Sequence, residues 1–506
     1  MIKKLFIVFI FCVFAAPCFG TPYYIDPSLG GGAETGLTMA DAYHSWADAT
    51  ITAGNDYRQK CGTTYTGTVT VTASGTSGDL IVLGAYNADG TVEDGKEVFG
   101  QLCSGGLAKP IIRYASSGRT SNAIYINGGE YIDINSIQLT TSEHGVRIEG
   151  DNNSVQYCYF FHTKYGVRVG LALASDSNTM EYNYVDLDEV TDETGDTQNC
   201  FSIQSNADNN TVQYNHCTGY DHAGIFTTSG DSNIYQYNYI YGDVTYHTED
   251  NCFDFNFNAN SNKVRYNWCN DAGKGISMLG GNSNEIYGNV FKCNGATKPG
   301  SNVGCIQYDP PVDGYGIQNN LVYNNTIYDN DNFSGQDGVF IRNGADESGV
   351  ISDNYFVNNI ILKVSDTCFS VVDNSGTIGT NYFYNNDCYD YGGNYASIEG
   401  TTDADAANFN AGFAFATGNL GADPGLNSPA TGEFWPASSA SNVYQSGYNV
   451  GAPYDTLLLS TSDFTASPPS VQTQQFATDY IGAYGLVGAA TPTYPIQGAA
   501  GNFKLN

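Results

Sequence analysis

The middle of the chain carries titratable side chains at regular intervals. His222, Asp250, Asp254, Asp271 and Lys274 fall within three successive segments, each marked by a Gly or Cys followed by alternating apolar residues. A lysine or histidine can act as a general base, and two carboxylates can divide the roles of acid and base. Stacked segments would bring such groups to within ~4.8 Å, one strand spacing, of each other. Lys274, His222, Asp250 and Asp271 are therefore our candidate catalytic residues.

The same stretch offers oxygen ligands for a cation. Glu249, Asp250 and Asp254 carry carboxylates, the ligand type that Ca²⁺ prefers. A bound Ca²⁺ would neutralise an acidic substrate and make an adjacent proton easier to remove. We predict a Ca²⁺ site at these three residues.

Two pairs of side chains are candidates for substrate binding. Arg147 and Arg168 lie one segment apart and could bind a carboxylate, although pairing with a neighbouring glutamate is the alternative. Tyr239 and Trp268 belong to a stripe of aromatic residues and one histidine in five successive segments. Such a stripe can stack on sugar rings, or its members can pack against one another as neighbours on a sheet. The stripe comprises Tyr159, Tyr184, His216, Tyr239 and Trp268.

A repeat must position these residues. The Gly or Cys anchor alternates along the chain with a second anchor, an Asn three residues after an apolar residue. Short strands of period-2 alternation that recur every 22 residues or more, with no helical spacing, cannot form hairpins and must stack in parallel. The pattern predicts an all-β chain folded as a right-handed parallel β-helix. The Asn anchors are residues 183, 215, 238, 267, 289, 325, 354 and 386.

Two columns support this prediction. An Asn at a tight turn tolerates the left-handed conformation and can bond to its counterpart in the next coil. Two residues after each Asn stands an apolar residue, as a core column requires. Cys158 replaces the Asn in the first clear coil, so we expect the ladder to begin after it. The core column is predicted to contain Val185, Cys217, Ile240, Cys269, Phe291, Ile327, Phe356 and Cys388.

The ends of the chain differ from its middle. Residues 1–20 have two lysines, an apolar run and a small-residue cleavage site, which indicates a secretory signal peptide. Residues 21–120 should form an N-terminal cap and the first coils, 121–390 the repeats, and 391–506 a C-terminal cap over the exposed strand edge. No later apolar run is long enough for a membrane span. We expect a monomer that is secreted or held at the cell surface, with a periplasmic location as the alternative.

The cysteines favour a single disulfide. Eleven of the thirteen lie beyond the signal segment. Those in the core column substitute for Val, Ile or Phe, and those at the Gly anchor recur two coils apart, ~9.6 Å, beyond disulfide reach. Cys61 with Cys103 is the one bridge we predict, because both lie outside the columns. The other cysteines are interpreted as small buried hydrophobes.

Composition excludes two classes of protein. The 506 residues include 52 acidic and 19 basic side chains, for a net charge of −33. A hydrophobic content of 41% argues against disorder. The scarcity of Lys and Arg argues against binding nucleic acid through a general electrostatic surface. A polysaccharide is the partner we expect.

Several segments resemble a known family. Tyr23–Pro27, Ala53–Tyr57 and Asp479–Tyr484 are similar to the entry, first coil and closing segment of exported right-handed parallel β-helix proteins of the pectin-lyase-like superfamily. The resemblance covers nearly all of the chain after the signal segment. It implies a solenoid fold and an active site on the outward side of the strands that begin at the Gly or Cys anchor. It is specific for the fold and weak for activity, because the superfamily contains several activities and proteins without catalysis.

Three functions follow from this resemblance. The first is a polysaccharide lyase that performs β-elimination on a uronate polymer, with Ca²⁺ neutralising the carboxylate and Lys274 or His222 as the base. The second is a glycoside hydrolase using Asp250 with Asp254 or Asp271. Asp250–Cys252 followed by Gly273–Gly275 resembles the Asp-Asp-Cys and Gly-His-Gly pairing of polygalacturonases, but Asn251 and Lys274 depart from it. The third is a non-catalytic carbohydrate-binding or structural surface protein.

Overall fold

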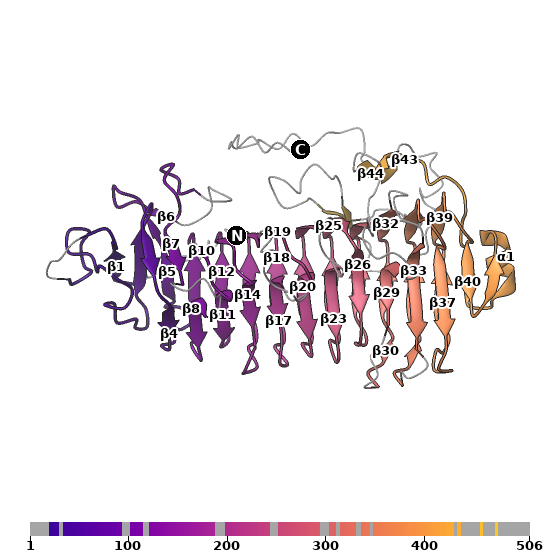
Figure 1. Ribbon diagram of the computed structural model, residues 1–506, viewed down its shortest axis with the longest axis horizontal. Helices are drawn as coiled ribbons and strands as arrows, with labels where there is room; N and C mark the ends of the chain where they lie inside the picture. The colour runs from indigo at the N-terminus through magenta and orange to yellow at the C-terminus, as the bar shows by residue number, and fades with distance from the viewer. Residues whose placement is uncertain are drawn as a thin grey trace, which may run out of the picture.

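The computed structural model shows three long sheets that run the length of the molecule. Each coil contributes one strand to each sheet, and Figure 1 shows the strands side by side from β1 at one end to α1 at the other. Neighbouring strands of these sheets are parallel, except where β6 and β41 form antiparallel pairs at their edges. The predicted parallel β-helix is confirmed. The structure describes residues 20–29, 34–93, 102–114, 121–187, 198–242, 251–293, 303–309, 314–329, 335–344, 348–429, 433–436, 456–458 and 471–473.

The strands of the three sheets follow one another around each coil. Sheet A contains β1 (Pro22–Ile25), β2 (Asp56–Lys60), β5 (Ile81–Tyr86), β6 (Val92–Glu93), β9 (Ile132–Asn135), β12 (Ser154–Gln156), β15 (Thr179–Glu181), β18 (Thr211–Gln213), β21 (Ile234–Gln236), β24 (Lys263–Arg265), β27 (Glu285–Tyr287), β31 (Leu321–Tyr323), β35 (Tyr355–Val357), β38 (Tyr382–Tyr384) and β42 (Ala416–Thr417). Sheet B contains β3 (Thr64–Thr66), β7 (Ile111–Arg113), β10 (Gln138–Thr140), β13 (Tyr159–Phe161), β16 (Tyr184–Asp186), β19 (His216–Thr218), β22 (Tyr239–Tyr241), β25 (Trp268–Ala272), β28 (Val290–Cys293), β32 (Thr326–Asp329), β36 (Ile360–Leu362) and β39 (Asp387–Tyr389). Sheet C contains β4 (Val69–Val71), β8 (Asn122–Asn127), β11 (His144–Glu149), β14 (Tyr165–Val169), β17 (Asn199–Ile203), β20 (Ala223–Thr228), β23 (Asn251–Asn256), β26 (Lys274–Met278), β29 (Val303–Tyr308), β33 (Gln336–Asn343), β37 (Phe369–Asp373), β40 (Ala396–Ile398) and β41 (Thr401–Asp403).

Shorter elements complete the chain. They are the pairs β30 (Ile317–Gln318) with β34 (Ile351–Ser352), β43 (Leu426–Ser428) with β44 (Glu433–Pro436), and β45 (Thr456–Leu458) with β46 (Val471–Thr473), together with the helix α1 (Ala406–Gly412). Among the described residues, no helix has the length and apolar character needed to cross a membrane. The predicted signal segment, residues 1–20, lies outside the described residues except for Gly20.

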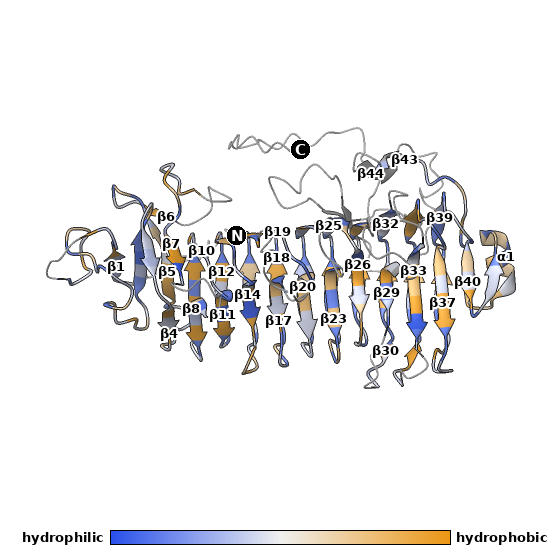
Figure 2. Cartoon of the chain, in the orientation of Figure 1, coloured by the Kyte–Doolittle hydropathy of each residue, from blue (hydrophilic) through white to orange (hydrophobic). Residues whose placement is uncertain are grey.

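The core is built from in-register columns of apolar side chains. Val185, Cys217 and Ile240 align in successive strands of sheet B, as predicted. Polar and apolar residues alternate along many strands (Figure 2). In the next-to-last coil the column residue is Ile361 and not the predicted Phe356. Phe356 belongs to sheet A, because the Asn that precedes it is part of a different ladder.

Two asparagine ladders run along the solenoid, where the sequence pattern predicted one. In each, an Asn Oδ1 accepts the backbone N–H of the Asn one coil earlier, and their buried amides link coil to coil. Asn359, and not Asn354, is therefore the anchor of its coil. The first ladder is Asn183, Asn215, Asn238, Asn267, Asn289, Asn325, Asn359, Asn386 and Asn419. The second is Asn153, Asn178, Asn210, Asn233, Asn262, Asn284, Asn320, Asn354 and Asn381.

The left-handed conformation falls on the residue before every ladder Asn except Asn381. Tyr182, Tyr214 and Tyr237 have φ of 57 to 58°. Their rings stack coil on coil at centroid distances of 5.0 and 4.9 Å. The prediction that the Asn itself takes this conformation was wrong. The ladder Asn provides the hydrogen bonds, while stacking between neighbouring rings offsets the strain of a positive φ at tyrosine.

Five disulfides are present, where the sequence predicted one. Cys61–Cys103 is confirmed, and it joins two successive coils, because Cys61 follows β2 and Cys103 follows the neighbouring strand β5. The interpretation of the column cysteines as unpaired hydrophobes was wrong, because their bridges cross within one turn of the chain and not between the same positions of different coils. The further bridges are Cys200–Cys217, Cys252–Cys269, Cys293–Cys305 and Cys368–Cys388. Cys158 is the free cysteine of the described residues. Five disulfides are typical of proteins that fold in an oxidising, extracytoplasmic compartment.

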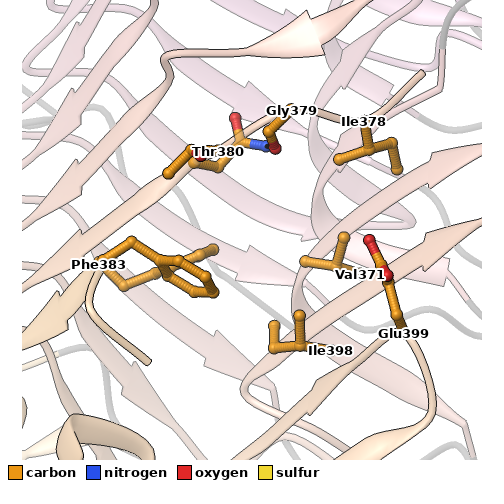
Figure 3. Close-up of a pocket in the computed structure, with 9 residues that line it drawn as sticks. Val371, Ile378, Gly379, Thr380, Phe383, Ile398 and Glu399 are labelled. Carbon is orange, nitrogen blue, oxygen red and sulfur yellow. Dashed lines mark hydrogen bonds between the residues drawn. The ribbon is translucent and has the colours of Figure 1, made fainter. Parts of the chain in front are cut away.

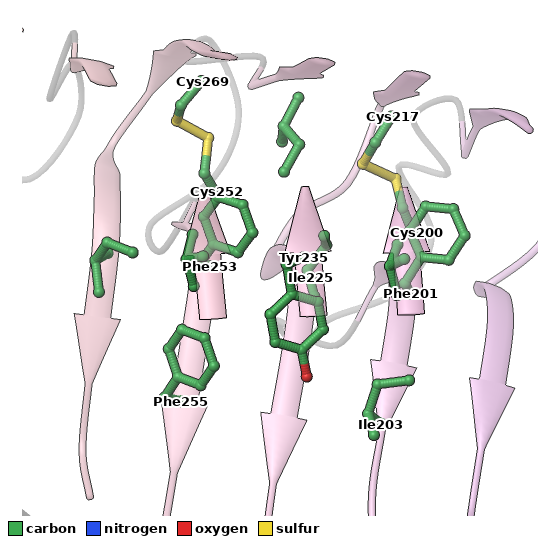
Figure 4. Packing of buried hydrophobic residues seen from close by; sticks show 14 of the residues in the cluster. Cys200, Phe201, Ile203, Cys217, Ile225, Tyr235, Cys252, Phe253, Phe255 and Cys269 are labelled. Atoms are coloured by element: carbon green, nitrogen blue, oxygen red, sulfur yellow. A yellow bond between two sulfur atoms is a disulfide. The ribbon is translucent and has the colours of Figure 1, made fainter. Parts of the chain in front are cut away.

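In the coil between two disulfides, a glycine and a bulky residue occupy the positions of the two cysteines: Gly224 stands at the position of Cys200, and Ile240 at that of Cys217. A Cβ at Gly224 would lie 2.5 Å from Ile240 Cγ2, and Figure 4 shows this coil between the bridges Cys200–Cys217 and Cys252–Cys269. In the coils around Gly224 the pair of positions therefore holds either two cysteines or a glycine with a large apolar side chain, whereas Cys305 pairs with Cys293, outside the column.

This alternation predicts that a glycine with a large apolar residue can replace a cysteine pair. Cys252→Gly combined with Cys269→Ile should fold and lose about 3 kcal/mol of unfolding free energy, the loop-closure contribution of such a bridge. Cys269→Ile alone should lose more, because the remaining Cys252 side chain occupies the space. Thermal unfolding followed by circular dichroism compares the two variants. A double variant no more stable than the single one would contradict the interpretation.

The C-terminal end of the solenoid is closed by α1. Asp405 caps this helix by accepting the backbone N–H of Asn408, and Phe409 packs into the end of the core against Phe369 and Phe383. A cavity of about 260 Å³ lies in the last coils (Figure 3). It is lined by Val371, Ile378, Gly379, Thr380, Asn381, Phe383, Ile398, Glu399 and Phe415.

One buried carboxyl near this end makes stability depend on pH. Burial, and then repulsion from Asp423, raise the pKa of Asp387 from 3.8 to about 7. Between these values the folded state holds a proton that the unfolded chain has released, so stability falls as pH rises through this window. The wild type should lose about 4 kcal/mol more unfolding free energy between pH 4 and pH 8 than Asp387→Asn does. Parallel pH dependences in urea unfolding of the two proteins would refute this.

Candidate active site on sheet C

The outward face of sheet C brings three of the predicted residues, Arg147, Arg168 and Asp254, into one register. Residues of this face alternate with core residues such as Val146 and Ile148. One column runs through Arg147, Arg168, Ser202, Phe226, Asp254, Ser277, Gln307, Phe340 and Ser370. The stacking predicted from the Gly and Cys anchors is therefore present.

His222 and Asp254 form a pair at the centre of this face. The His222 Nε2 lies 3.0 Å from Asp254 Oδ2, and its Nδ1 lies 2.9 Å from Asn199 Oδ1. That amide oxygen also accepts the backbone N–H of Ala223, which fixes it as an acceptor. Both ring nitrogens therefore face acceptors, so the geometry favours the doubly protonated imidazolium. A histidine held in this way suits electrostatic positioning better than proton abstraction.

Lys274 and Asp271 lie on either side of a sheet boundary. Lys274 begins β26, which pairs with β23, the strand that carries Asp254. It is in register with Asn251 of β23. Asp271 belongs to β25 of sheet B, where its carboxylate lies 2.9 Å from the Lys292 amine of β28. The structure thus places Lys274 on the same face as His222 and Asp254, and gives Asp271 an ion pair on the neighbouring sheet.

The predicted Ca²⁺ ligands do not form a set among the described residues. Glu249 and Asp250 lie outside them. Asp254 is described, but its side chain is 2% exposed and one oxygen faces His222. Within the described ranges, no three His, Cys, Asp or Glu side chains are grouped so as to hold a metal ion. The described residues therefore do not form a Ca²⁺ site.

Arg147 and Arg168 differ in their partners. Arg147 donates from Nε and Nη2 to Glu149 Oε1, at 2.8 and 2.7 Å, and lies over the Tyr125 ring. Arg168 donates to Gln204 Oε1 from Nη2 at 2.7 Å and from Nε at 3.2 Å. The alternative of pairing with a glutamate thus holds for Arg147, whereas Arg168 donates to the neutral side chain of Gln204.

His144 completes the surroundings of Arg168. Its Nε2 lies 3.1 Å from Arg168 Nη1 and accepts a hydrogen bond, because guanidinium can only donate. Its Nδ1 lies 2.8 Å from Asn122 Oδ1. Burial, followed by the charges of Arg168, Arg147 and Lys164, lowers the pKa of His144 to about 3. His144 is therefore neutral at physiological pH.

The aromatic stripe is largely buried. Trp268 is 9% exposed and belongs to an apolar cluster of sheet A and sheet B residues against which Tyr239 packs. Burial raises the pKa of Tyr239 to about 12 and lowers that of His216 to about 4. The burial of these rings favours packing between neighbours over stacking on a sugar, so Tyr239 and Trp268 are not part of the candidate site.

Sequence reasoning missed the residue that orients His222. Asn199 stands directly before the anchor Cys200, in a column that also contains His144, Tyr165, Asn251 and Lys274. The same contact recurs where His144 meets Asn122. An Asn directly before an anchor, one coil before a His, is the signal that could have identified it.

Comparisons with known proteins give no family for the chain. No family model and no curated protein matches the chain. Among solved structures it is similar to an alginate lyase from Paenibacillus sp. str. FPU-7, with 16% identity, a TM-score of 0.42, and coverage of 66% of this chain and 94% of that one. It is also similar to pectate lyase Pel9A, with 15% identity, a TM-score of 0.43 and coverage of 71% and 79%. The fold rests on the sheets themselves: by its three parallel sheets, the chain is a parallel β-helix protein.

Proposed function

We propose that the chain binds an acidic polysaccharide along the outward face of sheet C and cleaves it by β-elimination. The observation that carries the proposal is the position of Lys274, on the strand next to the buried His222–Asp254 pair. Lysine is the remaining candidate base, since both ring nitrogens of His222 face acceptors. The structural neighbours named as lyases are consistent with this proposal but do not carry it.

Lys274 alone could carry out both proton transfers of the elimination. The neutral amine of Lys274 takes the proton next to the uronate carboxylate. The released electron pair forms a carbon–carbon double bond as the bond to the glycosidic oxygen breaks. The ammonium formed at Nζ then returns the proton to the leaving oxygen, so no other acid is needed.

Hydrolysis receives less support from the described residues. An inverting hydrolase needs two carboxylates roughly 6.5–9.5 Å apart on one face. Both predicted pairs include Asp250, which lies outside the described residues, and Asp271, its partner in one of them, is engaged by Lys292 on sheet B.

A product assay tests the proposal. Polygalacturonate, alginate and neutral polysaccharides are incubated with the protein, in EDTA or with Ca²⁺, while unsaturated products and reducing ends are measured separately. We expect unsaturated products from an acidic polymer. Reducing ends without unsaturation would point to hydrolysis, and binding without any product would point to a non-catalytic module; either result refutes elimination.

A further inference from the structure

One cation on the sheet C face forms no ion pair with an acidic side chain of the described residues. Arg168 is half-buried, and among the described residues no carboxylate forms an ion pair with it. Gln204 and His144 hold the guanidinium, and neither carries charge, because His144 is neutral. Burial lowers the pKa of Arg168, while the nearby charges of Glu143 and Glu149 oppose this shift. A fixed, partly desolvated positive charge is unusual in a chain with a net charge of −33.

The guanidinium is also fixed in orientation. It lies over the Tyr165 ring, with Cζ 4.7 Å from the ring centroid. Its contacts with Gln204 and His144 use three of its five N–H groups and leave one on each Nη. Two N–H groups on neighbouring nitrogens are what a carboxylate takes in a bidentate pair.

The neighbouring arginine cannot play this part. Arg147 is in register with Arg168, but Glu149 neutralises it. Glu149 is itself buried and held by the backbone N–H groups of Ala172 and Leu173. The net positive charge of this stretch of the face therefore falls on Arg168.

We propose that Arg168 is a carboxylate-binding subsite for the acidic sugar chain, at a distance from the reacting centre. The inference rests on the proposed function for its polymer, and it adds that a uronate carboxylate is bound several sugar residues from the bond that breaks. Four strand steps separate Arg168 on β14 from Lys274 on β26, a distance of about 19 Å along the face.

Calorimetric titration tests this subsite. Short oligomers of galacturonate and of mannuronate, and the same oligomers with their carboxyls reduced to alcohols, are titrated into Lys274→Met, which should not consume them. Adding Arg168→Gln should weaken binding of an acidic oligomer about tenfold to a hundredfold. Arg168→Lys should restore part of the loss, because it keeps the charge without the fork. The reduced oligomers should bind all variants alike.

Matched controls separate the outcomes. Arg113→Gln removes an exposed arginine on sheet B and should leave binding unchanged. Equal affinity of an acidic oligomer with and without Arg168, or tighter Arg168-dependent binding of sulfated dextran, would overturn the carboxylate subsite. Arg168-dependent binding in a protein that forms no unsaturated product would overturn elimination and leave the subsite standing. If the protein forms unsaturated product and Arg168→Gln leaves KM unchanged, the subsite is overturned and elimination stands.

Discussion

Replacing Lys274 by methionine is expected to lower the rate of unsaturated product formation about 10²- to 10⁴-fold, the range that general base catalysis supplies. Methionine keeps most of the apolar length of the side chain and removes the amine. The His222–Asp254 pair does not replace the lost base, because both imidazole nitrogens already face acceptors. Affinity for the acidic polymer should change much less than turnover, since the amine acts on the proton that is removed.

The matched control is another half-exposed lysine. Lys263 lies on β24 of sheet A, where its amine is 3.4 Å from a Glu285 oxygen. Lys263→Met should retain wild-type turnover and a similar thermal stability. If Lys274→Met also keeps wild-type turnover, Lys274 is not the base. The same loss in both variants would indicate a general effect of charge.

Removing one ladder amide is expected to cause the largest loss of stability. Asn267 Oδ1 accepts from the backbone N–H and the Nδ2 of Asn238, and its own Nδ2 donates to Tyr235 O and Asn289 Oδ1. Asn267→Ala leaves two buried donors without an acceptor. At 1–3 kcal/mol for each, the variant should lose about 2 to 6 kcal/mol of unfolding free energy.

An exposed asparagine of the same coil provides the comparison. Asn258 is exposed in the turn after β23, and Asn258→Ala should change stability by less than about 0.5 kcal/mol. Urea unfolding of both variants measures the difference. Similar stability of the two would show that the ladder hydrogen bonds contribute little.

The solenoid was predictable because its signals are local and repeated. Alternation in strands such as Thr211–Gln213 and recurring Asn anchors are enough to define coils. The prediction of a single Asn ladder was wrong, because it required knowledge of which residues meet around a coil. Asn354 and Asn359 stand five residues apart and both follow an apolar residue by three, so spacing alone did not show that two ladders exist.

The disulfides illustrate the same limit. Columns predict which residues stack along the solenoid, whereas Cys200–Cys217 joins two columns across one corner of the core. The exchange of Gly224 with Ile240 for a cysteine pair was present in the sequence. It became interpretable only when the clash at Gly224 was visible.

The register of the candidate residues was predictable, but the hydrogen bonds and ion pairs of their side chains were not. The outward register of Arg168, Asp254 and Ser277 follows from the anchors. That Glu149 neutralises Arg147, or that Asn199 fixes the His222 ring, depends on side-chain geometry. The burial of Trp268 likewise depends on how the side chains of neighbouring coils pack.

A crystal structure of Lys274→Met with a bound uronate oligomer tests the sheet C site most directly. We expect the oligomer to lie along the outward face of sheet C, with one carboxylate paired to Arg168 and a glycosidic bond beside position 274. An oligomer bound on sheet A or sheet B, or lying across sheet C without contact to these two positions, would contradict the proposed site.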